Sequence, residues 1–141
     1  RSSDLIHASN TSVIDSGTIQ VTSSTEAIEG TNVTINGGSL DLYATDDGIN
    51  ASSDVTGAEI FIKVTGGDIK LEVGQGDTDA LDSNGDLIVS GGSLDITAQF
   101  AFDFDGTAEY SGGNLTVNGE TVTEITNSMM MGGGGGRPSG R

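Results

Sequence analysis

Carboxylate and carboxamide side chains recur at two fixed positions around a repeated apolar residue. One position lies two residues before the apolar residue, and the other lies directly after it. Oxygen ligands in this number favour Ca²⁺, and the lack of Cys beside a single His argues against a zinc or copper site. The series are Asp4, Glu26, Asp47 and Asp79 before the apolar residue, and His7, Glu29, Asn50, Asp82 and Asp105 after it, around Ile6, Ile28, Ile49, Leu81 and Phe104.

Stacked carboxylates need charge compensation. Two carboxylates about 5 Å apart repel by about 3 kcal/mol at an effective dielectric near 20, and several such pairs exceed a typical folding margin. Either protons stay on the carboxylates or a cation binds between them. We predict a calcium site made by Asp47, Asn50, Asp77, Asp79, Asp82 and Asp105, with Glu29, Asp46 and Asp103 nearby.

The alternative is a hydrated acidic surface without a specific ion. The recurrence of acidic residues beside an apolar column favours a specific calcium site over a hydrated surface. The position two residues before the apolar residue becomes Phe102 in the last copy, so metal binding is expected to end there.

These residues are carried by a repeat punctuated by glycine. Gly-Gly pairs occur at Gly37, Gly66, Gly91 and Gly112, and Ser16-Gly17 is an imperfect earlier copy. A period in the twenties with strand-forming residues between glycines is typical of a solenoid. Three further apolar columns recur with it: Ile14, Ile35, Val64, Val89 and Tyr110; Ile19, Leu40, Ile69, Leu94 and Leu115; Val21, Leu42, Leu71, Ile96 and Val117.

The repeat predicts an all-β fold. Alternation of apolar and polar residues indicates strands, and the ordered columns argue against disorder even though only 33% of residues are hydrophobic. We predict a β-solenoid of five to six coils over residues 1–128, with Gly-Gly corners, and an irregular Met- and Gly-rich tail over residues 129–141. The long coil after Ile49 is expected to hold insertions at 52–58 and 74–77, and Ile125 to begin a sixth coil.

Charge limits the partners. The formal net charge is −16, so neither nucleic acid nor an anionic membrane is an expected partner. No apolar run has membrane-spanning length, so membrane insertion is not expected. The chain does not begin with Met, which we interpret as a processed, extracellular or cell-surface protein.

Several segments together resemble a known family. They are 45–51 (TDDGINA), 76–86 (GDTDALDSNGD), the Gly-Gly-Ser-Leu-Asp turns and the Met/Gly-rich tail. The chain resembles, over nearly its whole length, a bacterial extracellular carbohydrate-binding family whose members fold as calcium-binding, right-handed parallel β-helices. The resemblance implies this fold and handedness, a metal role for Asp47, Asn50, Asp79 and Asp82, and binding to acidic or plant-wall polysaccharide.

An enzyme is not expected. A lyase needs a strong base and cationic groups that stabilise the intermediate, but all three Arg residues lie at the termini. Paired carboxylates could serve a hydrolase, but none stands apart from its column. A polysaccharide-binding module is one of two non-enzymatic hypotheses. Tyr43 and Phe61 are its candidate exposed rings, and Ca²⁺ could bridge the protein to uronate carboxylates.

The favoured hypothesis from the sequence is a structural subunit. An uncapped solenoid presents unpaired strand edges, and head-to-tail contacts that do not close a ring produce filaments. Basic termini beside an acidic body suit contact with a neighbouring copy. The predicted self-assembly residues are Arg1, Met129, Met130, Met131, Arg137 and Arg141.

Overall fold

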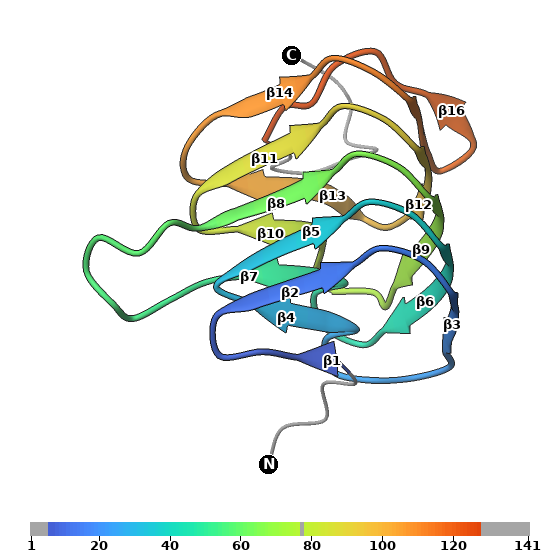
Figure 1. The fold of residues 1–141 in the computed structure, drawn as a ribbon. Helices are drawn as coiled ribbons and strands as arrows, with labels where there is room; N and C mark the ends of the chain where they lie inside the picture. The colour runs from blue at the N-terminus through green and yellow to red at the C-terminus, as the bar shows by residue number, and fades with distance from the viewer. Residues whose placement is uncertain (1–5, 77, 128–141) are drawn as a thin grey trace.

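The computed structural model describes residues 6–76 and 78–127 of the 141-residue chain. In this part the chain forms strands and no helix, and successive strands wind into a parallel β-solenoid of five coils (Figure 1). Each coil contributes one strand to each of three sheets, so every sheet is a stack of corresponding strands from successive coils. This confirms the predicted fold class.

The three sheets follow the chain in order. The first contains β1 (Ile6–His7), β4 (Ile28–Gly30), β7 (Ile49–Ala51), β10 (Asp79–Ser83) and β13 (Phe100–Phe104). The second contains β2 (Thr11–Ile14), β5 (Asn32–Ile35), β8 (Phe61–Val64), β11 (Asp86–Val89) and β14 (Ala108–Tyr110). The third contains β3 (Thr18–Val21), β6 (Ser39–Ala44), β9 (Asp68–Val73), β12 (Ser93–Thr97), β15 (Asn114–Val117) and β16 (Glu120–Thr121).

The apolar columns form the core as predicted. Ile35 pairs with Val64 in the second sheet, and Leu42 pairs with Leu71 in the third. All four of these side chains are buried. Like residues therefore stack on like residues from coil to coil, which gives a solenoid a continuous core in place of one compact cluster.

The predicted register is wrong in the last coil of the first sheet. Leu81 pairs with Phe102, and Ser83 pairs with Phe104. Phe102 is 2% exposed and completes the apolar column, whereas Phe104 is only half-buried. The residue beside Asp82 is consequently Asp103, not Asp105, and Phe100 takes the position opposite Asp79.

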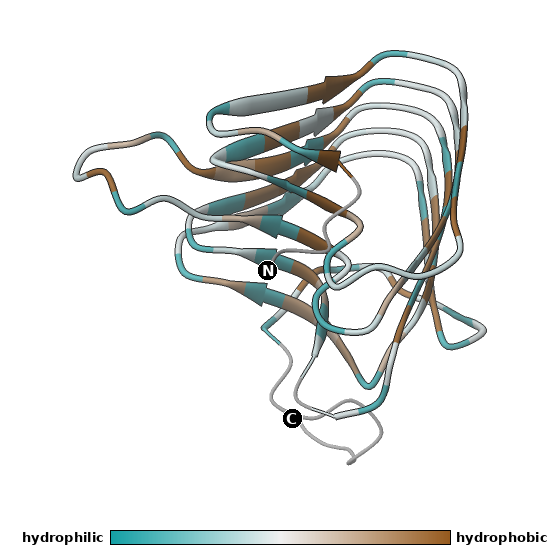
Figure 2. Cartoon of the chain, turned by 90° about the horizontal axis from the view of Figure 1, so that it is seen from below, coloured by the Kyte–Doolittle hydropathy of each residue, from teal (hydrophilic) through white to brown (hydrophobic). Residues whose placement is uncertain are grey.

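Two insertions lengthen the third coil. Paired residues are 21 apart in the first sheet (Ile28 and Ile49) and 29 apart in the second (Ile35 and Val64), so the connection from β7 to β8 carries eight extra residues. Leu81 pairs with Ile49 at a separation of 32, so three more residues lie between β9 and β10. The first insertion projects from the stack of strands in both views (Figures 1 and 2).

At the corners, the backbones of successive coils come into close contact. Gly92 has a φ of 86°, and a Cβ on it would lie 2.9 Å from the Gly66 carbonyl carbon. Gly17, Gly38, Gly67 and Gly113 also have positive φ. Only glycine adopts this backbone conformation without strain while leaving room for the next coil.

The C-terminal end is partly covered. The strand β16 pairs with β15 antiparallel, through a turn at Asn118 and Gly119 that both have positive φ. The Asn127 side chain accepts a hydrogen bond from the Phe104 amide at 2.7 Å and donates one to the Phe104 carbonyl at 3.0 Å. Ile125 is buried but belongs to no strand, so among the described residues no sixth coil forms.

Candidate functional site

Three aspartates from two adjacent coils lie together. Asp79 and Asp82 are in β10, and Asp47 directly precedes the Gly48-Ile49 pair at the start of β7. One carboxylate oxygen from each lies within 4.8 Å of the others. The Asp79 amide also donates a hydrogen bond to Asp47 Oδ1 at 2.9 Å, which fixes the Asp47 side chain against the next coil.

A local irregularity places Asp79 and Asp82 on the same side of the strand. Residues three apart in a regular strand point to opposite faces. Here Ala80 and Leu81 are consecutive and both are fully buried, so the alternation shifts by one residue between the two aspartates. Small residues occupy this inner position in every described copy of the pattern: Ala27, Gly48, Ala80 and Ala101.

Hydrogen bonding shows the same irregularity at the start of β4, two coils before β10. The amides of Ala27 and Ile28 both donate to the Gly48 carbonyl, at 2.9 and 3.2 Å. Two residues facing one is the pairing of a β-bulge, which often re-aims side chains beside functional sites.

Asp82 is the member of the cluster whose pKa is raised. Burial raises its pKa from 3.8 to about 8; a hydrogen bond with Asp47 and the negative charges of Asp47, Asp103 and Asp79 contribute in the same direction. Without a cation, the Asp82 carboxyl therefore retains its proton at neutral pH. A bound cation would reverse this preference by favouring the carboxylate.

The same column is differently satisfied in the first three coils. His7 Nδ1 lies 2.8 Å from Glu29 Oε1, and Asn50 Nδ2 donates to Glu29 Oε2 at 3.1 Å. Glu29 therefore has an imidazole and an amide as partners. The clustered aspartates begin one coil after Glu29, with Asp47 in the third coil. Asn50 pairs in register with both Glu29 and Asp82, so its amide lies in the column between these two acidic residues.

The remaining predicted ligands are dispersed. Asp103 is the register neighbour of Asp82 but is exposed. Asp105 is also exposed and follows β13, where its amide donates to the Ser83 carbonyl. Asp46 is half-buried, and its amide donates to the Thr25 carbonyl. Asp4, Asp77, Arg1 and residues 128–141, which include Met129–Met131, Arg137 and Arg141, lie outside the described residues.

The donor set suits a hard cation. Asp47, Asp79 and Asp82 offer oxygen atoms only, and the nearest further groups in the column are the Asn50 amide and the Asp103 carboxylate. Ca²⁺ takes six to eight oxygen ligands. Three carboxylates with one amide would leave coordination positions for water or a ligand.

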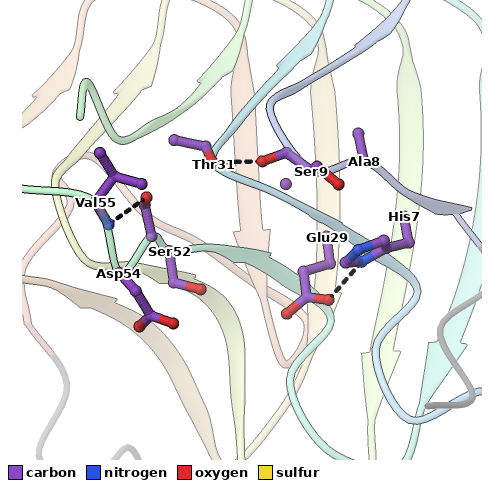
Figure 3. A pocket seen from close by; sticks show the side chains of 10 residues that line it. His7, Ala8, Ser9, Glu29, Thr31, Ser52, Asp54 and Val55 are labelled. Carbon is purple, nitrogen blue, oxygen red and sulfur yellow. Dashed lines mark hydrogen bonds and ion pairs between the residues drawn. The ribbon is translucent and has the colours of Figure 1, made fainter.

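A polar groove lies near the start of the solenoid (Figure 3). It has a volume of about 300 Å³ and runs between the ends of β1 and β4 and the insertion after β7. Its lining residues are His7, Ala8, Ser9, Glu29, Gly30, Thr31, Ser52, Ser53, Asp54 and Val55. No repeat or motif in the sequence indicates this groove; the one available signal is the insertion at 52–58.

The two rings considered for sugar stacking are not prominent. Tyr43 and Phe61 are both half-buried, and neither lines the groove. Within the described residues, no helix has the length and apolar character needed to cross a membrane.

Comparison with known proteins gives one match. A family model described as "carbohydrate-binding domain-containing protein" matches residues 1–130. Neither the curated proteins nor the solved structures that were compared gave a match. The family match covers most of the chain and agrees with the parallel β-solenoid, so this chain belongs to the family of carbohydrate-binding domain-containing proteins.

Proposed function

We propose that this chain is a non-enzymatic, extracellular module that binds acidic polysaccharide with the help of calcium. The observation that carries the proposal is the meeting of Asp47, Asp79 and Asp82, with carboxylate oxygens within 4.8 Å of one another. Membership in the carbohydrate-binding family supports the general role. The calcium requirement and the acidic ligand are the proposed parts.

Charge explains why calcium and an acidic ligand belong together. A polyuronate and a chain of net charge −16 repel each other. A Ca²⁺ ion held by three carboxylates would still have coordination positions that a uronate carboxylate can occupy. The ion would thus hold two adjacent coils together and bridge the protein to the polymer.

Polygalacturonate retardation tests this proposal. The full chain is run through gels containing the polymer, with millimolar calcium and with chelator. We expect retardation in calcium only, and we expect Asp82→Asn to lose about tenfold in affinity because one charged ligand is removed. Asp95 is exposed on β12, in another sheet. Asp95→Asn removes the same charge there and serves as the matched control. Equal retardation with calcium and chelator would reject the calcium requirement.

End-to-end assembly into filaments is the second candidate. The strands β1, β2 and β3 are each the last strand of a sheet at one end, and β14 is the last strand of the second sheet at the other end. Such edges can pair with a second copy. Against this, β16 covers β15 and Asn127 bonds to Phe104, so a neighbour could extend the second sheet more readily than the other two.

A further inference from the structure

The groove of about 300 Å³ is built by a segment that only one coil possesses. Its floor comes from the ends of β1 and β4, with His7 and Ser9 from the first coil and Glu29 and Thr31 from the second. Its opposite wall is the insertion between β7 and β8. Figure 3 shows Ser52, Asp54 and Val55 of the insertion facing His7, Ser9 and Glu29 across the groove.

Hydrogen bonds form on both sides of the groove. On the floor, formed by the ends of β1 and β4, His7 contacts Glu29 at 2.8 Å, and the Thr31 hydroxyl donates to the Ser9 carbonyl at 2.9 Å. In the insertion, the Val55 amide donates to Ser53 Oγ at 3.0 Å. Contacts between coils therefore shape the side of the groove at β1 and β4, and a local turn shapes the insertion on the other side.

The lining chemistry selects the ligand. Glu29 and Asp54 provide carboxylate acceptors, four hydroxyl side chains can donate or accept, and no Lys or Arg of the described part lines the groove. A uronate carboxylate would meet two carboxylates here, of which Glu29 is in contact with His7, and no metal-binding cluster. A neutral sugar would offer hydroxyl donors to the two carboxylates and acceptors to the serine and threonine hydroxyls.

The tip of the insertion adds an apolar contact. Val55 is 69% exposed, one of two exposed large hydrophobic residues in the described part of the chain. Pyranose rings have apolar C–H faces as well as hydroxyl edges, so an apolar side chain beside carboxylate acceptors can contact both. Without an aromatic platform, each sugar unit would bind weakly.

We infer that this groove is a binding site for a neutral glycan chain, separate from the aspartate cluster. The inference rests on the proposed carbohydrate-binding role but not on calcium or on an acidic ligand. Glu29 and Asp54 accept hydrogen bonds from sugar hydroxyls, the hydroxyl side chains complete the contacts, and Val55 packs on a ring face. The module would then recognise two kinds of sugar at two places.

Amide chemical-shift mapping tests the inference on the full chain. Neutral hexasaccharides of glucose, mannose and xylose are titrated in turn, with calcium and with chelator. We expect at least one of them to shift the amides of residues 7–9, 29–31 and 52–55 in both conditions. Asp54→Ala should weaken this binding by about tenfold through the loss of one charged acceptor. Asp95→Ala, exposed on β12, should not.

The outcomes separate this inference from the proposed function. Neutral sugars that shift no groove amide, or that bind Asp54→Ala as tightly as the wild type, would overturn the groove assignment. Polygalacturonate retardation of Asp54→Ala is measured in parallel and should remain normal. Its loss in the Asp82→Asn variant, with groove binding intact, would establish two separate sites.

Discussion

At the scale of single residues, one column of side chains changes character along the solenoid. In the first three coils, His7 and Asn50 each form a hydrogen bond with Glu29. Asp82 and Asp103 follow in the same column, and Asp47 and Asp79 lie beside Asp82. The first half of the column is satisfied by side-chain hydrogen bonds. The second half collects carboxylates whose repulsion a cation would relieve.

Proton release on calcium binding is the prediction at this scale. Because the pKa of Asp82 is raised to about 8, the carboxyl is protonated at pH 7, and calcium must displace that proton. We expect about one proton released per bound ion at pH 7 and much less at pH 9. Calcium titrations in buffers of different ionisation enthalpy measure this number directly. Zero release at pH 7 would mean that calcium does not bind at Asp82.

The same shift predicts the pH dependence of stability. An acid whose pKa is higher in the folded than in the unfolded state holds its proton more tightly when folded. In chelator, the free energy of unfolding should therefore fall as pH rises from about 4 towards 8, since the unfolded value is near 3.9. Asp82→Asn should remove most of this fall. A wild-type stability that rises through this window in denaturant titrations would contradict the account.

At the scale of elements, the irregular start of each strand in the first sheet positions the cluster. For β4, β7, β10 and β13, a pair of consecutive buried residues precedes the outward position, and the first member of the pair is Ala or Gly. At Gly48, an added Cβ would lie 2.6 Å from the Ala80 carbonyl oxygen and 2.7 Å from Leu71 Cδ1. The space is therefore limited by backbone on one side and by the core on the other.

Gly48→Ala tests this packing. We expect the substitution to destabilise the fold by about 2 kcal/mol, as overpacking of a core does, and to weaken calcium binding by displacing Asp47. Gly74→Ala is the control, because its nearest neighbour would be 3.5 Å from the added Cβ. Chemical denaturation and calcium titration measure the two effects. Equal stability of the two variants would show that the Gly48 position can accept a side chain.

The apolar columns could be predicted from sequence because a solenoid places like residues in register. Ile28, Ile49 and Leu81 align without ambiguity, and so do the acidic residues two positions before each of them. In the last coil, Phe102 and Phe104 are both apolar and share one parity. The alternation of apolar and polar residues could not choose between them. The coil length was the better signal, because Phe102 is 21 residues from Leu81, the same separation as between Ile28 and Ile49.

Other features had no repeat to reveal them. The groove depends on where the insertion after Ala51 lies relative to His7 and Glu29, and a non-repeating segment carries no register information. The bond between Asn127 and Phe104 joins residues 23 apart without any strand pairing. The hairpin at Asn118-Gly119 did have a local signal, since Asn-Gly is a preferred two-residue turn between strands.

At the scale of the whole molecule, the two candidate sites share the third coil and extend from it in opposite directions along the solenoid. The groove involves the first three coils, and the aspartate cluster involves the third and fourth, with Asp103 in the fifth. A polymer could therefore contact both along the height of the solenoid. Stacked copies would repeat both sites along a filament, so the two functional candidates are compatible.

Self-assembly makes its own prediction. If copies stack, sedimentation velocity in calcium should show growth with concentration for the full chain. Removal of residues 129–141 should reduce this growth, because the predicted contacts include Met129–Met131, Arg137 and Arg141. Negative-stain electron microscopy would identify filaments. Both chains sedimenting as monomers at high concentration would reject the filament proposal and leave the binding module.

Calorimetric titration of calcium into the full chain at pH 8 shows whether the aspartate cluster binds the ion. We expect saturable binding with a dissociation constant on the order of 10⁻⁴ M, as extracellular calcium modules show. We also expect Asp79→Asn to weaken this binding by about tenfold, as for the loss of one charged ligand at Asp82, and Asp95→Asn to leave it unchanged. Absence of saturable binding in the wild type, or equal binding by Asp79→Asn, would contradict the assignment of Asp47, Asp79 and Asp82 as a calcium site.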